Sequence, residues 1–303
     1  MRLHMVCHVY CRILMLIFSL SLVFFSTAVF ADWTPLIDRL VADKFDEQTV
    51  RTLFAQPGVK FDADIMSCKL KELIHNRSKR PDDLYARKIR TAYARFLRPE
   101  AIEDAHSYAQ RNNAALEKIA RTYCVPKEIV VSILLVETEL GQNLGRRSAF
   151  NTLASMASSS ELETIRPYLD PDLVTKKNEA FARKRCRQKA EWAYAELKAL
   201  IRYASESGMD TLSIPGSLYG AIGLCQFMPS KISTYGVDAD ADGRVNIFSE
   251  QDALYSVANY LRAHGWKCSM STKRQHRVIL AYNNSNIYAN TVLGVAGKLK
   301  RRE

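Results

Sequence analysis

Residues 216–229 read Gly-Ser-Leu-Tyr-Gly-Ala-Ile-Gly-Leu-Cys-Gln-Phe-Met-Pro, with three glycines in the first eight positions. Glycine adopts backbone conformations that other residues avoid, and it lets a backbone approach a ligand closely. Pro229 stands where a helix can begin, because proline is favoured at the first helical position. We therefore predict a ligand-facing loop that is followed by a short helix. The polar and aromatic side chains at the end of this glycine loop (216–229) suit a sugar.

Glu137 lies about eighty residues before this loop, in an apolar segment, 126–140, that predicts a buried helix. Its neighbours at helical spacing are all apolar, whereas Glu139 shares its face of the helix with a serine. A carboxyl group among apolar side chains has a raised pKa, which keeps it protonated as a general acid requires. The alternatives are an ion pair with Arg146 or Arg147, or a cap on a neighbouring helix. The apolar neighbours are Val130, Ile133, Leu134 and Leu140.

The rest of the chain shows the 3.6-residue periodicity of helices and no convincing strand, which predicts an all-α fold. We expect residues 155–190 to be polar and irregular. Gly141 is expected just after the buried helix, where glycine commonly ends a helix. The expected helices cover 34–55, 61–76, 82–97, 99–123, 126–140, 188–206, 229–235, 250–263, 272–282 and 286–300.

The first 31 residues have the pattern of a secretory signal peptide. Arg2 and Arg12 form a basic segment before the apolar run 13–30, and Ala31 completes a small-residue cleavage site. The alternative is an uncleaved membrane anchor, because an apolar run of this length can just span a bilayer. We predict a periplasmic or secreted protein, whose formal charge falls from +11 to +9 when the two arginines are removed. Such a basic protein meets acidic envelope polymers or a membrane surface, and export disfavours nucleic acid.

Five cysteines remain in the exported chain, and their wide spacing does not suit a zinc module. Outside the cytoplasm one or two disulfides are expected, and the odd number leaves at least one free thiol in a monomer. The sequence leaves the pairing open. Cys225 lies inside the glycine loop, where a reactive or disulfide-bonded thiol would alter a binding groove. The five are Cys68, Cys124, Cys186, Cys225 and Cys268.

Six segments follow one another in an order that resembles a known family. They are Val-Glu-Thr-Glu-Leu-Gly at 136–141, Asn-Thr-Leu-Ala at 151–154, the glycine loop continued to Ser230, Asp-Ala-Asp-Ala-Asp-Gly-Arg-Val-Asn-Ile-Phe at 238–248, Ser-Val-Ala-Asn-Tyr-Leu-Arg-Ala-His-Gly-Trp at 256–266, and Ala-Tyr-Asn-Asn-Ser at 281–285 with Tyr288. Together they resemble the lytic murein transglycosylases of the membrane-bound B type. The region before about residue 110 resembles the family more loosely.

The resemblance implies a lysozyme-like fold of the goose type with an EF-hand-like calcium loop. It divides the exported chain into an N-terminal helical lead-in, 32–109, and a catalytic domain, 110–303. It also implies cleavage of the β-1,4 bond between N-acetylmuramic acid and N-acetylglucosamine without water, which leaves 1,6-anhydro ends. Glu137 corresponds to the family's single catalytic acid, and the chemistry needs no cofactor. The implied partners are glycan strands and envelope proteins, and we expect a monomer.

Five residues fall where the family lines its sugar subsites. Hydroxyl and amide groups can hydrogen-bond to sugar hydroxyl and acetamido groups, and aromatic rings can pack on sugar rings. The alternatives are core packing for the two tyrosines and a hydrogen bond within the loop for the serine. The five are Ser217, Gln226, Tyr282, Asn283 and Tyr288.

An acidic loop follows the short helix. Ser249 stands at position 12 of an EF-hand-like pattern and cannot supply the bidentate carboxylate found there, so an ordinary EF-hand fails. The resemblance implies a longer loop that is closed by Asp252, with the backbone carbonyl of Arg244 as a further ligand of a structural Ca²⁺. The alternative is a solvated turn before a helix that is capped by Ser249. Positions 1, 3, 5 and 6 are Asp238, Asp240, Asp242 and Gly243.

Two other functions stay open. A hydrolytic muramidase on the same fold would use the same acid, and a non-catalytic peptidoglycan-binding protein would keep the groove without cleaving the glycan. The segment 155–215 is longer than the family's usual spacer, and it is a candidate lid, partner surface or extra subsite.

Overall fold

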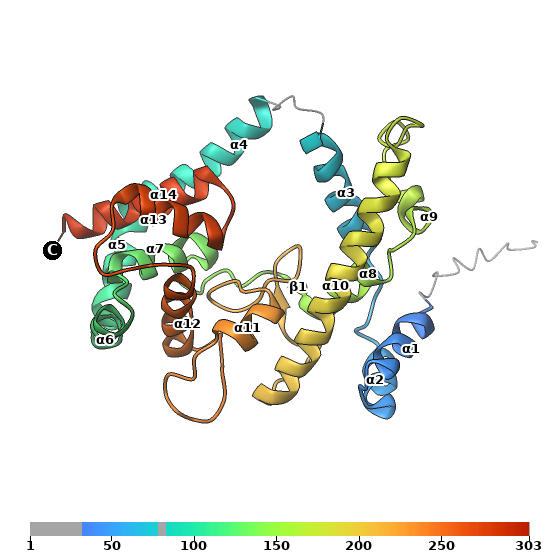
Figure 1. Cartoon of the computed structure of the whole chain (residues 1–303), viewed down its shortest axis with the longest axis horizontal. Helices are drawn as coiled ribbons and strands as arrows, with labels where there is room; N and C mark the ends of the chain where they lie inside the picture. The colour runs from blue at the N-terminus through green and yellow to red at the C-terminus, as the bar shows by residue number, and fades with distance from the viewer. Residues whose placement is uncertain (1–31, 78–82, 303) are drawn as a thin grey trace, which may run out of the picture. The chain divides into compact units, whose positions relative to one another are not determined.

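The computed structural model describes residues 32–77 and 83–302. The predicted signal peptide, 1–31, therefore lies outside the described residues. Within them the chain is mainly helical, as predicted, with one short two-stranded sheet (Figure 1). The elements are α1 (Thr34–Ala42), α2 (Glu47–Phe54), α3 (Ala63–Arg77), α4 (Asp83–Ala94), η1 (Arg95–Leu97), α5 (Pro99–Arg111), α6 (Asn113–Tyr123), α7 (Lys127–Thr138), β1 (Arg147–Ser148), α8 (Ala149–Ala157), α9 (Leu162–Ile165), η2 (Arg166–Tyr168), α10 (Glu179–Ser207), β2 (Pro215–Gly216), α11 (Pro229–Tyr235), α12 (Glu250–Ala263), α13 (Thr272–Tyr282) and α14 (Asn286–Lys300).

Two of the expected helices are each divided in two. The segment 34–55 turns at Lys44, whose φ is 70°, and Asp46 then caps α2 by accepting a hydrogen bond from the Thr49 amide at 2.8 Å. The segment 99–123 breaks at Asn112, whose side-chain amide donates to the Tyr108 carbonyl at 3.2 Å. Short polar side chains that bond to nearby backbone compete with a continuous helix.

The expectation of irregular structure over 155–190 is wrong at both ends. Helix α8 begins at Ala149 behind the cap of Ser148, and its apolar residues are buried. Helix α10 begins at Glu179, earlier than residue 188, and its first turn is stabilised by an ion pair between Glu179 and Arg183 at 2.7 Å. This pair lies four residues apart, which is the spacing that supports a helix of polar composition.

Helix α7 lies at the centre of one group of helices. Its residues 129–135 are all buried, and α5, α6, α12 and α14 pack around it. A second group consists of α3, α8 and α10, and α11 contacts both α10 and α12 (Figure 1). Residues 32–109 supply α3 to the second group and α4 and α5 to the first. The sheet pairs 147–148 with 215–216, which ties the start of the glycine loop to the segment after α7.

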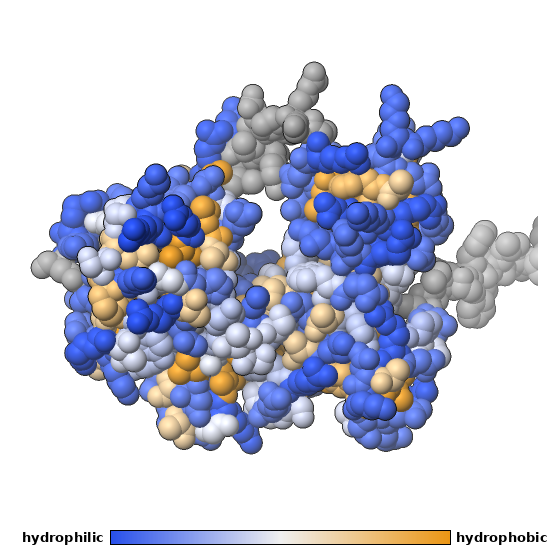
Figure 2. Space-filling view, viewed as in Figure 1, coloured by the Kyte–Doolittle hydropathy of each residue, from blue (hydrophilic) through white to orange (hydrophobic). Residues whose placement is uncertain are grey.

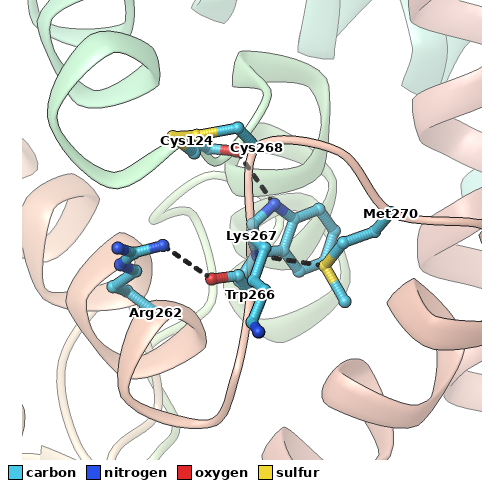
Figure 3. Close-up of a disulfide and its surroundings, with 6 residues drawn as sticks. All are labelled: Cys124, Arg262, Trp266, Lys267, Cys268 and Met270. Carbon is cyan, nitrogen blue, oxygen red and sulfur yellow. Dashed lines mark hydrogen bonds between the residues drawn. A yellow bond between two sulfur atoms is a disulfide. The ribbon is translucent and has the colours of Figure 1, made fainter.

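One disulfide joins Cys124, at the end of α6, to Cys268, which follows α12 (Figure 3). Trp266 lies beneath it almost completely buried, and its indole N–H donates to the Cys124 carbonyl at 2.9 Å. Arg262 donates to the Trp266 carbonyl at 3.1 Å. The expectation of a disulfide is thus confirmed, and among the described residues Cys68, Cys186 and Cys225 remain free thiols.

Hydrophilic residues dominate the face of the molecule that Figure 2 shows. A hollow in this face separates the surface over α13 and α14 from the surface over α10. Leu218 of the glycine loop and Tyr168 are the large hydrophobic residues that stay exposed in the described part of the chain. None of the helices described is both long enough and apolar enough to cross a membrane.

Candidate active site

Glu137 lies in the last turn of α7, with its side chain partly buried. Its Oε1 accepts a hydrogen bond from the Tyr288 hydroxyl at 2.7 Å. Burial raises the pKa of Glu137 to about 7, although the bond from Tyr288 lowers it. The alternative pairing with Arg147 does not occur, because Arg147 binds Asp62. The carboxyl group therefore carries a proton over much of the range in which a general acid works.

The turn after Glu137 is held in an unusual backbone conformation. Glu139, Leu140 and Gly141 have successive φ values of 52°, 61° and 93°. Left-handed backbone is costly for residues other than glycine, so neighbouring contacts must hold it. The Thr138 hydroxyl donates to the Leu224 carbonyl at 2.9 Å and accepts from the Gly141 amide at 3.1 Å. The end of α7 is thereby fixed to the glycine loop. Helix α7 ends before Glu139, two residues earlier than a cap at Gly141 would place it.

The two predicted tyrosines lie next to each other beside Glu137. The rings of Tyr282 and Tyr288 are nearly parallel, with centroids 6.4 Å apart. The Tyr282 hydroxyl donates to the Cys225 carbonyl at 2.6 Å, so it ties α13 to the glycine loop. Asn283 follows Tyr282 directly and is partly buried at the end of α13. Both tyrosines therefore take part in core packing, which is the alternative role that the sequence offered for them.

Tyr93 was not predicted as part of this site. It lies on α4, and its ring packs edge-on against Tyr288 at 6.4 Å between centroids. Burial raises the pKa of the Tyr93 hydroxyl, and the nearby charge of Glu137 raises it further. Tyr93 and Tyr288 therefore supply two phenol groups close to the same acid. A single aromatic residue in a helix gives no signal of such a contact, because the contact depends on how α4 packs on α14.

Hydrogen bonds within the glycine loop fix its shape. The Ser217 hydroxyl accepts from the Ala221 amide at 3.0 Å, which is the loop role offered as the alternative for this serine. Gln226 has a φ of 48°, and its side-chain amide donates to the Gly223 carbonyl at 2.9 Å. A Cβ atom at Gly223 would lie 2.6 Å from Ile247, so the loop needs glycine there. Ser217 and Gln226 both stay partly exposed and can still reach a ligand.

Cys225 lies under the loop as a free thiol that is fully buried. Burial raises the pKa of this thiol to about 12, so it stays protonated at neutral pH. It is neither disulfide-bonded nor a reactive thiolate, because only the thiolate is a strong nucleophile. Its role in this structure is packing beneath the glycine loop.

Three acidic residues of the second candidate site converge. Oxygen atoms of Asp238, Asp240 and Asp252 lie within 4.8 Å of one another. Asp252 is buried, and its two oxygens accept backbone hydrogen bonds from Ala239 at 2.9 Å and Asn246 at 2.6 Å. Burial and the two neighbouring acids raise the pKa of Asp252. Three carboxylates this close repel one another, and hard oxygen donors of this kind suit a divalent cation. These residues could hold a metal ion.

The other residues predicted for the metal site make different contacts. Asp242 accepts a hydrogen bond from the Arg244 amide at 2.8 Å, and it does not belong to the converging group. Ser249 caps α12 by accepting from the Asp252 amide at 3.2 Å. The helix cap and the converging carboxylates therefore exist together, although the sequence presented them as alternatives.

With this geometry in view, comparisons with known proteins identify the family. A family model described as the transglycosylase SLT domain matches residues 30–275. The membrane-bound lytic murein transglycosylase B of Escherichia coli K12 is 30% identical over 172 residues, which are 57% of this chain and 40% of that relative. The chain thus matches less than half the length of that relative.

Solved structures show the same fold. The lytic transglycosylase Slt35 of Escherichia coli, in complex with bulgecin A, superposes with a TM-score of 0.68 at 22% identity, covering 91% of this chain and 95% of that chain. The same enzyme in complex with calcium gives a TM-score of 0.67 at 22% identity, with the same coverage. SltB3 of Pseudomonas aeruginosa, in complex with NAG-NAM-pentapeptide, gives 0.65 at 22% identity over 88% of this chain and 79% of that chain. The chain belongs to the transglycosylase SLT domain family.

Proposed function

We propose that this member of the transglycosylase SLT domain family is an exported lytic transglycosylase. It would cleave the β-1,4 bond between N-acetylmuramic acid and N-acetylglucosamine in peptidoglycan and leave a 1,6-anhydro end. The observation that carries the proposal is the single partly buried carboxyl group of Glu137, with a pKa of about 7 and one hydroxyl donor. No ion pair to Glu137 exists among the described residues, so nothing forces it into the charged form.

Glu137 would act first as an acid and then as a base. Protonated Glu137 gives its proton to the glycosidic oxygen as the bond from that oxygen to the anomeric carbon breaks. The acetamido group of the sugar stabilises the cationic carbon, which is a known alternative to a second carboxylate. The sugar's 6-hydroxyl then bonds to that carbon and gives its proton to the carboxylate of Glu137. No water is consumed, and Glu137 returns to its starting form.

Tyr288 supports both forms of the acid. Burial raises the pKa of Tyr288 well above 10, so its hydroxyl stays protonated and donates to Glu137. This bond strengthens when Glu137 becomes a carboxylate, because hydrogen bonds to charged acceptors are stronger. Tyr288 thereby limits how far burial raises the pKa of Glu137.

Four of the five residues predicted from sequence would bind the sugar, whereas Tyr288, which is almost completely buried, would act through its hydrogen bond to Glu137. The ring of Tyr282 lies beside Tyr288 and offers a face for a sugar ring. The partly exposed groups of Ser217, Gln226 and Asn283 offer hydrogen-bonding groups. The relative SltB3 was solved with NAG-NAM-pentapeptide, which makes the same class of ligand reasonable for this chain. Glycan strands of peptidoglycan are the proposed partner of the protein.

The converging carboxylates would bind a structural Ca²⁺. Asp238, Asp240 and Asp252 supply oxygen ligands, and Asp242 and the Arg244 carbonyl are the further ligands proposed from the sequence. The ion would neutralise the repulsion between the acids and stabilise the loop before α12; it takes no part in the cleavage step. Slt35, which has the same fold, was solved with calcium.

Placement in the cell follows from the same proposal. A signal peptide at 1–31 would send the chain to the periplasm or the outside, where its substrate lies. The division into a lead-in, 32–109, and a catalytic domain, 110–303, is also kept as a proposal. Both regions contribute helices to the group around α7, so they would fold together.

Product analysis tests the reaction. Purified sacculi are digested with the protein, and the released fragments are measured by mass spectrometry. We expect fragments with 1,6-anhydro ends, which are lighter by one water than fragments with reducing ends. If only reducing ends appear, the protein is a hydrolytic muramidase. If sacculi bind the protein and remain intact, it is a binding protein without activity.

A further inference from the structure

Three partly buried cations gather where α3 packs against α10. Lys69 lies on α3, and Arg185 and Lys189 lie one turn apart on α10. The Lys69 side chain keeps only 17% of its exposure. Helices α3 and α10 pack against each other, and burial together with the charges of Lys69 and Arg185 lowers the pKa of Lys189. We call these three residues the cation cluster.

The cation cluster has too few acids. Glu72 pairs with Lys69 at 3.0 Å and also accepts from the Tyr219 hydroxyl at 3.1 Å. Arg185 and Lys189 have no carboxylate within ion-pair distance in the part of the chain that the structure describes. Bringing like charges together away from water is unfavourable unless an opposite charge joins them. Glu72 is thus the one acid paired within a group of three cations, so two of the three positive charges have no carboxylate partner among the described residues.

Elsewhere on the same helix the partly buried cations are paired with acids. Arg183 lies 2.7 Å from both Glu163 and Glu179, and Lys198 pairs with Asp43 at 2.5 Å. These residues show that α10 is able to hold its positive charges with acids from neighbouring elements. The other cations of α10 without an ion pair among the described residues are Lys184, Arg187 and Arg202, and all three are exposed to water. Arg185 and Lys189 differ from them because they are partly buried and still have no carboxylate partner.

Aromatic rings hold the cluster in place beside the glycine loop. The Lys69 ammonium lies 4.3 Å from the centre of the Tyr219 ring, and the Lys189 ammonium lies 5.1 Å from the Trp192 ring. The Arg185 guanidinium lies 5.1 Å from the Phe181 ring. Contacts of this kind stabilise a cation without neutralising it. Tyr219 is two residues from Ser217, so the cluster borders the loop that is proposed to bind the glycan.

We propose that the cation cluster binds carboxylate groups of the peptide stem carried by the glycan substrate. This inference rests on the proposed function. Where a stem is attached, the lactyl carboxyl group of N-acetylmuramic acid is bound in an uncharged amide, so the stem supplies the anions that a bound strand brings to this place. Carboxylates bind ammonium and guanidinium groups through short, charge-assisted hydrogen bonds. Phosphate groups of an envelope polymer share this chemistry, and the experiment separates the two sources.

Binding measurements on the Glu137→Gln protein, which is expected not to cleave its ligand, test the inference. The probes are the disaccharide GlcNAc-MurNAc with its lactyl carboxyl group converted to an amide, the same disaccharide with a pentapeptide stem, and a glycerol-phosphate polymer. At low ionic strength the stem should tighten binding about tenfold, as expected for a difference of about 1.4 kcal/mol. Lys189→Gln should bring this ratio close to one. Lys184→Gln removes the same charge from an exposed position on α10 and should leave the ratio unchanged.

Each of the following outcomes would overturn the inference. If Lys189→Gln and Lys184→Gln reduce the tightening by the stem equally, only the overall positive charge of the protein attracts the stem. A stem that does not tighten binding, or a phosphate polymer that binds through Lys189 in its place, would exclude carboxylates as the ligand. A lower melting temperature of Lys189→Gln would mark a packing role, because removing a repelled charge should keep or raise stability. If the protein releases anhydro products but binds ligands with and without the stem equally well, the proposed function holds and this inference is wrong.

Discussion

Glu137 and Asp252 are two carboxyl groups that this fold removes from water in different surroundings. Glu137 has the Tyr288 hydroxyl as its hydrogen-bond donor, at 2.7 Å, and aromatic rings beside it. Asp252 receives two backbone N–H groups, one on each oxygen, and has two further carboxylates within reach. Burial is the main cause of a raised pKa in both.

The difference lies in what each site does with a negative charge. Backbone donors to both oxygens of Asp252 favour its charged form. A bound cation would offset the remaining cost of burying that charge. Glu137 has a single hydroxyl donor, which leaves its protonated and charged forms close in free energy near pH 7. The number and kind of donors thus separate a carboxyl group that exchanges a proton from one that holds an ion.

The largest expected effect is on activity. Glu137→Gln should lower turnover of sacculi by about 10³-fold, because a general acid and base typically contributes 10²–10⁴-fold. Glu139→Gln is the matched control, since Glu139 pairs with Arg95 at 3.0 Å and is two residues away. Release of soluble fragments from labelled sacculi measures both. A Glu137→Gln protein that keeps a tenth of the activity would remove Glu137 from the chemistry.

The same substitution should raise stability in one range of pH. The folded pKa of Glu137, about 7, lies above its ordinary value of 4.5, so the native state binds the proton more tightly than the unfolded chain. Its contribution is complete below pH 4.5 and is lost as the pH rises through 7, which costs at most ~3 kcal/mol. Glu137→Gln should therefore stabilise the protein at pH 8 and not at pH 4. Denaturant unfolding at both values checks this, and equal effects would contradict it.

Calcium should act at Asp252 and leave Glu137 unaffected. At a hundred times its dissociation constant, a bound ion adds about 2.7 kcal/mol to stability. We expect the melting temperature to rise with Ca²⁺ and fall with a chelator, and Asp252→Asn should abolish the response. Glu250→Gln, in the same first turn of α12 but outside the converging acids, should keep it. If Ca²⁺ does not change the melting temperature of the unmodified protein, the loop binds no calcium, and capping α12 through Ser249 is its remaining role.

These two sites also show what could be predicted from sequence. The environment of Glu137 could be predicted because it follows from helical offsets within one segment. Tyr93 could not, since it reaches Tyr288 only through the packing of α4 on α14. In the acidic loop, spacing pointed to Asp238, Asp240 and Asp242, and the family resemblance added Asp252. The structure brings Asp238, Asp240 and Asp252 together, but the Asp242 carboxylate turns to the Arg244 amide.

Local hydrogen bonds and long-range links explain the remaining differences. The all-α class and most helix positions follow from periodicity, which is a property of short segments. At the break, the Asn112 side-chain amide bonds the Tyr108 carbonyl and the Glu250 carboxylate, and periodicity does not show these contacts. The pairing of Cys124 with Cys268 spans 144 residues, and only the folded chain brings the two together.

The smallest expected effect is a shift in pH dependence. The Tyr288 hydroxyl lowers the pKa of Glu137, so Tyr288→Phe should raise that pKa by about one unit, in keeping with the strength of a hydrogen bond to a charged group. Because the protonated acid is the active form, kcat/KM should fall above about pH 7 in the unmodified protein and only above about pH 8 in the variant. Tyr282→Phe loses a hydroxyl that bonds the Cys225 carbonyl, and in this variant kcat/KM should still begin to fall near pH 7. If both variants shift the fall of kcat/KM to the same higher pH, general changes in the aromatic cluster control the pKa of Glu137. The number of donors, one for Glu137 and two for Asp252, would then not explain the difference between the two sites.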